Sequence, residues 1–339
     1  MSNSPIKIIN NQKDYLLNIR WNPNNVCNFN CRYCFPDNNT GTHKSPKDLD
    51  LVIANFTHML EQYQWKLNKD KFHFMIAGGE PTLWKDLGLF MREMKKRFDI
   101  YFTVISNGSR TVRWWKEHAS EIDDAHLTLH IAEGSVDHMI EVADILYEAG
   151  SKTTVKVLMD PEHWDKGVEY VETMKRHSKH PWFIQVAEVI EQDHVYLNSN
   201  KKRYTTEQLK YIDKESKRWP GPLWFWKNRH LFKEHLKLYE SKAELENGKV
   251  IKANAGTYLN RDQNHFEGWK CNIGLETVYI EWTGDIKGSC GAKIFNAEKH
   301  PNILDSKFKD SFRVTNEPIT CPYKSCFCLP ETHVTKSKF

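Results

Sequence analysis

The sequence predicts an α/β protein with a parallel sheet, and three observations support this fold class. Short apolar segments rich in β-branched and aromatic residues alternate with helix-like segments over the first 190 residues. The chain has 339 residues, more than one average domain. Its hydrophobic fraction is 40% and its charged fraction 27%, which excludes a disordered or fibrous chain. Strands separated by helices indicate βαβ crossovers, in either an open doubly wound sheet or a partial barrel.

The predicted strands and helices follow one another in strict alternation. Strands are predicted at residues 16–21, 72–77, 100–105, 126–131, 153–158 and 182–186. Helices are predicted between them at residues 46–65, 87–94, 111–120, 135–149 and 164–177. Apolar residues at helical spacing identify the helices. Pro46 fits the start of the first helix and Gly150 the end of the fourth.

The pattern changes after residue 190. The following segment is rich in Lys, Asn and aromatic residues, with helical patterns at 206–218 and 228–246. A hairpin is predicted over residues 277–287, with its turn at Thr283-Gly284. We therefore predict an α/β domain, a helical aromatic-rich linker or lid, and a C-terminal module, at residues 1–190, 191–260 and 261–339.

Charge and targeting signals limit the classes of partner. There are 48 basic and 44 acidic side chains, and the net charge of +4 is too small to argue for nucleic acid or an anionic membrane. The N-terminus lacks a basic segment followed by an apolar stretch, and the apolar runs are too short to cross a bilayer. We therefore expect a cytoplasmic protein without membrane or nucleic-acid partners, in which thiols stay reduced.

The eight cysteines form two groups that lie far apart in the sequence. The first group is Cys27, Cys31 and Cys34, and the second is Cys271, Cys290, Cys321, Cys326 and Cys328. A disulfide framework in a secreted protein is usually denser and belongs to a shorter chain. Two distant groups therefore indicate two metal sites.

The first cysteine group directly follows the first predicted strand. Its thiolates suit a polynuclear iron site better than zinc, which normally closes with four ligands. A [4Fe–4S] cluster held by three cysteines keeps one iron open to a small molecule. The alternative is zinc bound by these cysteines and His43, with the glycine pair at 78–79 acting only as a tight turn.

Three features together resemble the radical S-adenosylmethionine (radical SAM) superfamily: the cysteine spacing, Tyr33 just before Cys34, and the Gly-Gly-Glu-Pro tetrad at 78–81. The resemblance covers about residues 15–190. It implies a partial (β/α)6 TIM-like barrel, with the cluster and SAM at the carboxyl ends of the strands. It also implies one-electron cleavage of SAM to methionine and a 5′-deoxyadenosyl radical that abstracts hydrogen from substrate. A flavodoxin- or ferredoxin-type protein would supply the electron.

The resemblance assigns site residues position by position. It implies cluster ligands at Cys27, Cys31 and Cys34, and SAM contacts at Tyr33, Gly78, Gly79, Glu80, Pro81, Ser106, Asn107, Thr128 and Lys156. His130 replaces an aspartate found in many relatives, and is either a catalytic residue or a satisfied core histidine. Lys156 either pairs with the SAM carboxylate or extends its ammonium to solvent. Gln185 is either a substrate contact or a solvated edge residue.

The second cysteine group resembles the Twitch half of the SPASM/Twitch extension, which holds an auxiliary [4Fe–4S] cluster. A full SPASM module needs more cysteines than the five that this chain offers. All five are candidate ligands, and the favoured four are Cys271, Cys290, Cys326 and Cys328. Cys321 is then the spare thiol, which either donates a hydrogen atom during catalysis or is inert. A structural zinc site is the alternative.

The leading functional prediction is a radical SAM enzyme of the oxidoreductase or epimerase type. Its substrate would be a peptide, a sugar or another small molecule, and the outcome dehydrogenation, epimerisation or cross-linking. The alternatives are a zinc-stabilised binding protein without catalysis and a radical SAM enzyme that modifies RNA. Residues 224–226, Trp-Phe-Trp, are either packing residues or a stacking surface for the substrate.

Overall fold

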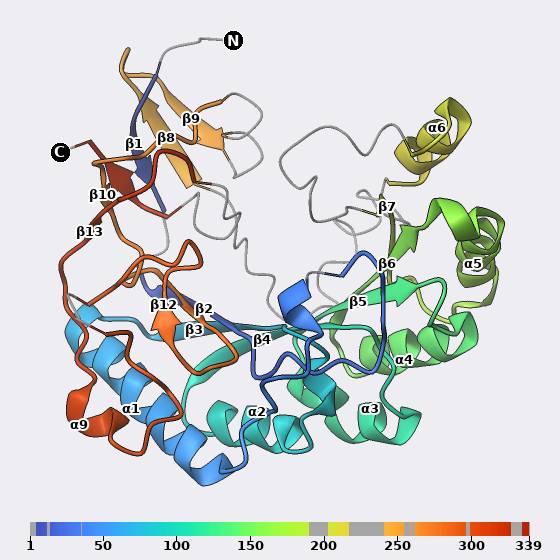
Figure 1. Cartoon of the computed structure of the whole chain (residues 1–339), viewed down its shortest axis with the longest axis horizontal. Coiled ribbons are helices and arrows are strands. Elements are labelled where there is room, and N and C mark those ends of the chain that lie inside the picture. Colours follow the sequence, from blue (N-terminus) through green and yellow to red (C-terminus); the bar gives the residue numbers. More distant parts are fainter. Residues whose placement is uncertain are drawn as a thin grey trace.

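The computed structural model contains two β-sheets, and helices cover one face of the larger sheet (Figure 1). The structure describes residues 5–11, 14–34, 36–189, 203–216, 241–253, 258, 262–295, 299–326 and 334–338. The Trp-Phe-Trp segment and Cys328 therefore lie outside the described residues. Within the described part of the chain, no helix combines the length and the apolar character needed to cross a bilayer.

The larger sheet has eight strands in the order β12-β11-β2-β3-β4-β5-β6-β7. Strands β2 to β7 follow chain order and pair in parallel throughout. Their bounds are Leu16–Trp21, Lys71–Ile76, Asp99–Ser106, Asp124–His130, Lys152–Met159 and Phe183–Glu188. These are the strands that the sequence predicts, and they form the parallel core of a partial barrel.

A helix follows each of the strands β2 to β6, because parallel neighbours need a long crossover connection. The helices α1 to α5 span Leu49–Leu67, Leu87–Lys95, Val112–His118, Val136–Glu148 and Trp164–His177. The first helix begins three residues later than Pro46 suggested, because the Asp48 side chain caps it by accepting from the Leu51 amide. Short 3₁₀ turns lie at Pro36–Asn38, Pro81–Leu83, Ala119–Glu121 and Pro161–His163.

The predicted hairpin is present and extends the larger sheet. Strand β11 (Thr277–Ile280) pairs antiparallel with β12 (Ile286–Lys287). On its other edge β11 pairs in parallel with β2, so a C-terminal segment lies beside the strand that leads into the first cysteine group. Two further helices, α6 and α9, span Thr206–Glu215 and Phe308–Ser311.

The smaller sheet is antiparallel and joins the beginning of the chain to its end. Its order is β13-β10-β14-β1-β8-β9. The bounds in chain order are Ile6–Asn10 (β1), Ser241–Leu245 (β8), Val250–Ala253 (β9), Lys270–Cys271 (β10), Ile319–Thr320 (β13) and Lys336–Ser337 (β14). The helix predicted over 228–246 is wrong at its described end. There Ser241, Ala243 and Leu245 are buried at alternate positions, the period of a strand.

The two faces of the larger sheet differ in chemistry. Toward the helices lie apolar side chains such as Ile19, Phe74 and Phe102, all fully buried in the main core. Side chains alternate along a strand, so the next residues point to the opposite face, which we call the inner face. One inner-face row, paired in register, consists of Tyr279, Arg20, Met75, Thr103, Asp124 and Lys152. The inner face of the partial barrel is therefore largely polar.

Candidate functional site at the cysteine loop

The first cysteine group lies in a loop at the carboxyl end of β2. Cys27, Cys31 and Cys34 form no disulfide with any described residue, and all three are half-buried. Burial raises the pKa of Cys31 to about 12, and the negative charges of the Cys34 and Cys27 thiolates add to that rise. The Cys31 sulfur is thus within electrostatic reach of both other thiols, and a positively charged iron centre would relieve this repulsion.

This donor set fits an iron–sulfur cluster, because soft thiolates select iron–sulfur clusters, copper(I) or zinc. Among the described residues, no three His, Cys, Asp or Glu side chains form a group arranged to hold a metal ion. The assignment of Cys27, Cys31 and Cys34 as ligands therefore rests on donor chemistry and spacing, and remains a prediction.

The glycine pair at the end of β3 packs against the backbone that leads into Cys27. The Gly79 amide donates to the Asn24 carbonyl at 3.0 Å, and the Glu80 amide donates to the Val26 carbonyl at 2.7 Å. A Cβ on Gly78, whose φ is +121°, would lie 2.5 Å from the Asn24 carbonyl oxygen. A Cβ on Gly79 would lie 2.3 Å from the Val26 carbonyl oxygen. Both positions need glycine, because the two backbones are almost in contact.

The change Gly79→Ala is expected to displace the start of the cysteine loop. The new methyl group would meet rigid backbone, so overpacking should lower the free energy of unfolding by about 1–3 kcal/mol. The iron content after anaerobic reconstitution should fall as well. Denaturant unfolding and iron analysis measure the two effects. A variant with wild-type stability and iron content would show that the close contact between the Gly79 and Val26 backbones is unimportant.

Glu80 connects the ends of β3 and β4 through its buried carboxylate. Its Oε1 accepts from the Thr82 amide at 3.0 Å, the Thr82 hydroxyl at 2.5 Å and the Ser106 hydroxyl at 2.8 Å. Its Oε2 accepts from the Asn107 amide at 2.7 Å. Burial raises the pKa of Glu80, and these hydrogen bonds offset part of the rise. The next residue, Pro81, begins a 3₁₀ turn that Glu80 itself caps.

Asn107 extends this connection to the first cysteine. Its Nδ2 donates to the Asn28 side-chain oxygen at 3.1 Å and approaches the Cys27 sulfur at 3.7 Å. The Phe29 amide also donates to the Cys27 sulfur, at 3.4 Å. Cys27 is therefore positioned by groups from the loop itself and from the end of β4.

Other residues of the loop contact the ends of β5 and β6. The Tyr33 hydroxyl lies 3.0 Å from His130 Nδ1, and the two rings stack with centroids 5.7 Å apart. Burial lowers the pKa of His130 to about 4, so its imidazole is neutral at pH 7 and can accept a hydrogen bond from the Tyr33 hydroxyl. Arg32 donates to Asp160 at 2.5 Å. His130, a candidate catalytic residue, thus touches the cysteine loop directly, a contact that the sequence did not reveal.

The remaining predicted contacts form one row on the inner face. Thr128, Lys156 and Gln185 lie directly opposite one another on β5, β6 and β7. All three are half-buried. His130 is two residues beyond Thr128 on the same face of β5, so the row lies just below the cysteine loop. The structure therefore brings these candidates together at one place on the inner face.

In the second cysteine group, three thiols lie near one another at the smaller sheet. Cys271 is buried on β10, and burial raises its pKa to about 11, with the Lys336 ammonium opposing that rise and the Cys321 and Cys326 thiolates adding to it. Cys321 follows β13, and its amide donates to the Trp269 carbonyl at 2.8 Å.

Cys290 shares its contact with the main core with Cys271 and Cys321. It follows β12 and packs against the main core, close to the point where a Cβ on Gly288 would lie. The fifth cysteine, Cys328, lies outside the described residues.

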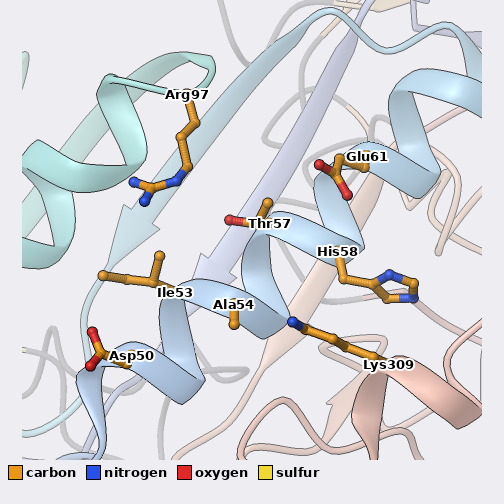
Figure 2. A pocket seen from close by; sticks show the side chains of 8 residues that line it. All are labelled: Asp50, Ile53, Ala54, Thr57, His58, Glu61, Arg97 and Lys309. Carbon is orange, nitrogen blue, oxygen red and sulfur yellow. The ribbon is translucent and has the colours of Figure 1, made fainter.

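A polar pocket lies elsewhere, on the outside of α1 (Figure 2). Its lining residues come from α1, from the segment after α2 and from α9, and they are Asp50, Ile53, Ala54, Thr57, His58, Glu61, Arg97 and Lys309. Because α1 covers the outer face of the larger sheet, the body of the sheet separates this pocket from the inner face. It contains none of the predicted site residues.

A family model matches part of the N-terminal half of the chain. Residues 21–174 match the family model described as the Radical SAM superfamily. A GTP 3′,8-cyclase of Nautilia profundicola is 31% identical over 110 residues, 32% of each chain. A GTPase Obg of Brachyspira hyodysenteriae is 26% identical over 207 residues, 57% of this chain and 29% of that one. Each alignment thus spans about a third of the curated relative's length.

One solved structure that aligns with this chain carries the description native anSMEcpe with bound AdoMet. It aligns with a TM-score of 0.47 and 16% identity, over 87% of this chain and 81% of that chain.

Proposed function

We propose that the protein cleaves SAM reductively and abstracts a hydrogen atom from a substrate, because residues 21–174 match the Radical SAM superfamily. The observation that carries the proposal is the loop of Cys27, Cys31 and Cys34 at the carboxyl edge of a parallel sheet. Ligands bind at this edge in parallel α/β folds.

The proposed cofactors are a [4Fe–4S] cluster on these cysteines and SAM beside it. When bound, the cluster would supply the electron that cleaves SAM to methionine and a 5′-deoxyadenosyl radical. A flavodoxin- or ferredoxin-type donor would deliver that electron. The chain's own residues position the cysteine loop: Glu80 and Asn107 hold its beginning, and Tyr33 and His130 hold its end.

For SAM itself, we propose the segment 78–81 and the row on the inner face. The Glu80 carboxylate accepts from Thr82, Ser106 and Asn107, so a contact with the methionyl amine would fall mainly to backbone carbonyls of this segment. Thr128 and Lys156 are the candidates for the rest of SAM, and Gln185 is the candidate for substrate.

We also propose that the C-terminal cysteines hold an auxiliary cluster of the Twitch type. The mutual influence of Cys271, Cys321 and Cys326 supports these three as ligands. Cys321, expected from the sequence to be the spare thiol, is then a ligand. Either Cys290 or Cys328 would complete the set, and the other would be the spare thiol.

The substrate classes that we propose are peptides, sugars and other small molecules, with dehydrogenation, epimerisation or cross-linking as the outcome. One curated relative is named for its action on GTP, which adds nucleotides to the candidates. An electron-accepting auxiliary cluster would favour dehydrogenation, whereas a spare thiol that donates hydrogen would favour epimerisation.

Metal analysis after anaerobic purification tests the two-cluster proposal. The wild-type chain should hold about eight irons and show brown absorbance, since each [4Fe–4S] cluster contributes four. The triple variant Cys27→Ala, Cys31→Ala, Cys34→Ala should keep about four irons at the C-terminal site. If zinc alone is found, the proposed enzyme function is wrong. If the triple variant holds no iron, there is no auxiliary cluster.

A further inference from the structure

Arg20 stands out among the inner-face residues because it is a charged side chain without an acidic partner among the described residues. It lies near the carboxyl end of β2, between Ile19 and Trp21, which are buried against the helices. It is half-buried, and its Nε is buried without a hydrogen-bond partner in the described part of the chain. Its guanidinium carbon lies 5.6 Å from the centre of the Tyr279 ring on the neighbouring strand.

The acidic side chain in the same row and the one that follows β11 are both engaged elsewhere. Asp124 belongs to the same row, three strands away, and lies 3.3 Å from both His126 and Lys152. Burial alone would raise the pKa of Asp124, but these two side chains hold it well below its usual range. Glu281, two residues beyond Tyr279, pairs with Lys287 at 2.7 Å. The positive charge of Arg20 is therefore not balanced within the row.

A second observation points to a ligand at the same place. Asn22 lies two residues after Arg20, on the same face, and is only 3% exposed. Its Nδ2 donates to the Tyr279 hydroxyl at 2.9 Å, which fixes the side-chain amide. Its Oδ1 is buried and has no hydrogen-bond partner among the described residues. A buried acceptor left unpaired costs free energy, which a donor on a bound molecule would recover.

We propose that Arg20 and Asn22 bind the substrate inside the barrel, with Arg20 taking an anionic oxygen group, a carboxylate or a phosphate. The planar guanidinium matches such groups with two parallel hydrogen bonds, and stacking on Tyr279 restricts its orientation. Asn22 takes a neighbouring N–H or O–H of the same molecule. This inference names the substrate class of the proposed function and rests on it. Cys27 follows Asn22 by five residues, so the site lies below the cysteine loop.

Anion titration of the full-length chain tests the site. Inorganic phosphate and acetate are titrated calorimetrically at constant ionic strength, into the wild type and into Arg20→Met, Arg20→Lys and Arg97→Met. Arg20→Met should weaken anion binding by at least about tenfold, because a charge-assisted pair of hydrogen bonds is lost. Arg20→Lys keeps the positive charge but lacks the planar guanidinium. Its affinity for the anions should therefore lie between those of the wild type and Arg20→Met. Arg97→Met, in the pocket outside α1, should match the wild type.

Each outcome supports or overturns the inference. Phosphate binding alone identifies a phosphorylated substrate group, and binding of both anions leaves a carboxylate equally suited. If neither anion binds the wild type, or Arg97→Met loses binding as strongly as Arg20→Met, the assignment is wrong. If saturating SAM abolishes binding, Arg20 holds the SAM carboxylate and not the substrate. The titration without SAM needs no iron and no reductant, so its result is independent of whether the protein cleaves SAM.

Discussion

Cys31→Ala is expected to abolish the formation of 5′-deoxyadenosine from SAM, down to the level of an unreduced control. Cys31 is the middle cysteine of the loop and lies within electrostatic reach of both Cys27 and Cys34. Without it the loop keeps only two thiolates, too few for a cluster that has one open iron. Chromatography of the nucleoside after anaerobic reduction measures the loss, and iron analysis should show about four irons fewer than in the wild type.

The matched control for this variant is Asn39→Ala, a substitution in the segment that follows the cysteine loop. It removes a polar side chain five residues after Cys34 in the sequence without removing a thiol, so it should leave both the iron content and the nucleoside yield at the wild-type level. Nucleoside formation by Cys31→Ala at the rate of this control would remove Cys31 from the proposed ligand set.

Glu80→Ala is expected to cause the largest loss of stability at the site, about 3–5 kcal/mol in the free energy of unfolding. The change leaves the buried Thr82 amide, Ser106 hydroxyl and Asn107 amide without their acceptor. Each unsatisfied buried donor costs about 1–3 kcal/mol. Denaturant unfolding of the apo-protein measures the effect without any cofactor.

Two further variants test whether the loss of stability comes from the lost hydrogen-bond acceptors of Glu80. Glu80→Gln keeps one acceptor oxygen and should lose less stability than Glu80→Ala. Glu61→Ala removes a carboxylate from the exposed face of α1 and should change the stability very little. If Glu80→Ala has the same free energy of unfolding as Glu61→Ala, the Glu80 carboxylate does not stabilise the connection between the ends of β3 and β4.

The larger sheet could be predicted because each of its elements carries its own signal. Strands β2 to β7 are segments of six to eight residues with buried apolar residues at alternate positions, and the helices between them show helical spacing. The smaller sheet gave much weaker signals. Three of its strands, β10, β13 and β14, have only two residues each, too few for any periodicity. Strand β1 pairs with β8 and β14, which lie far away in the sequence.

The candidate site could be predicted in part. The cysteine spacing and the glycine pair identify the loop, because they are local patterns. The contact of Tyr33 with His130 depends on where the end of β5 lies relative to the loop, which only the fold determines. Arg20 did give a signal, as a charged residue inside an apolar strand. Its proposed role could be inferred only from the register of β11 with β2, which places Tyr279 beside Arg20.

The proposed SAM cleavage is tested by the yield of 5′-deoxyadenosine when the reconstituted wild-type protein is reduced anaerobically with SAM. We expect the nucleoside and methionine to appear in equal amounts, and only in the presence of both iron and reductant. A protein that holds its full complement of iron, binds SAM and yet forms no 5′-deoxyadenosine above the iron-free control would contradict the proposed function.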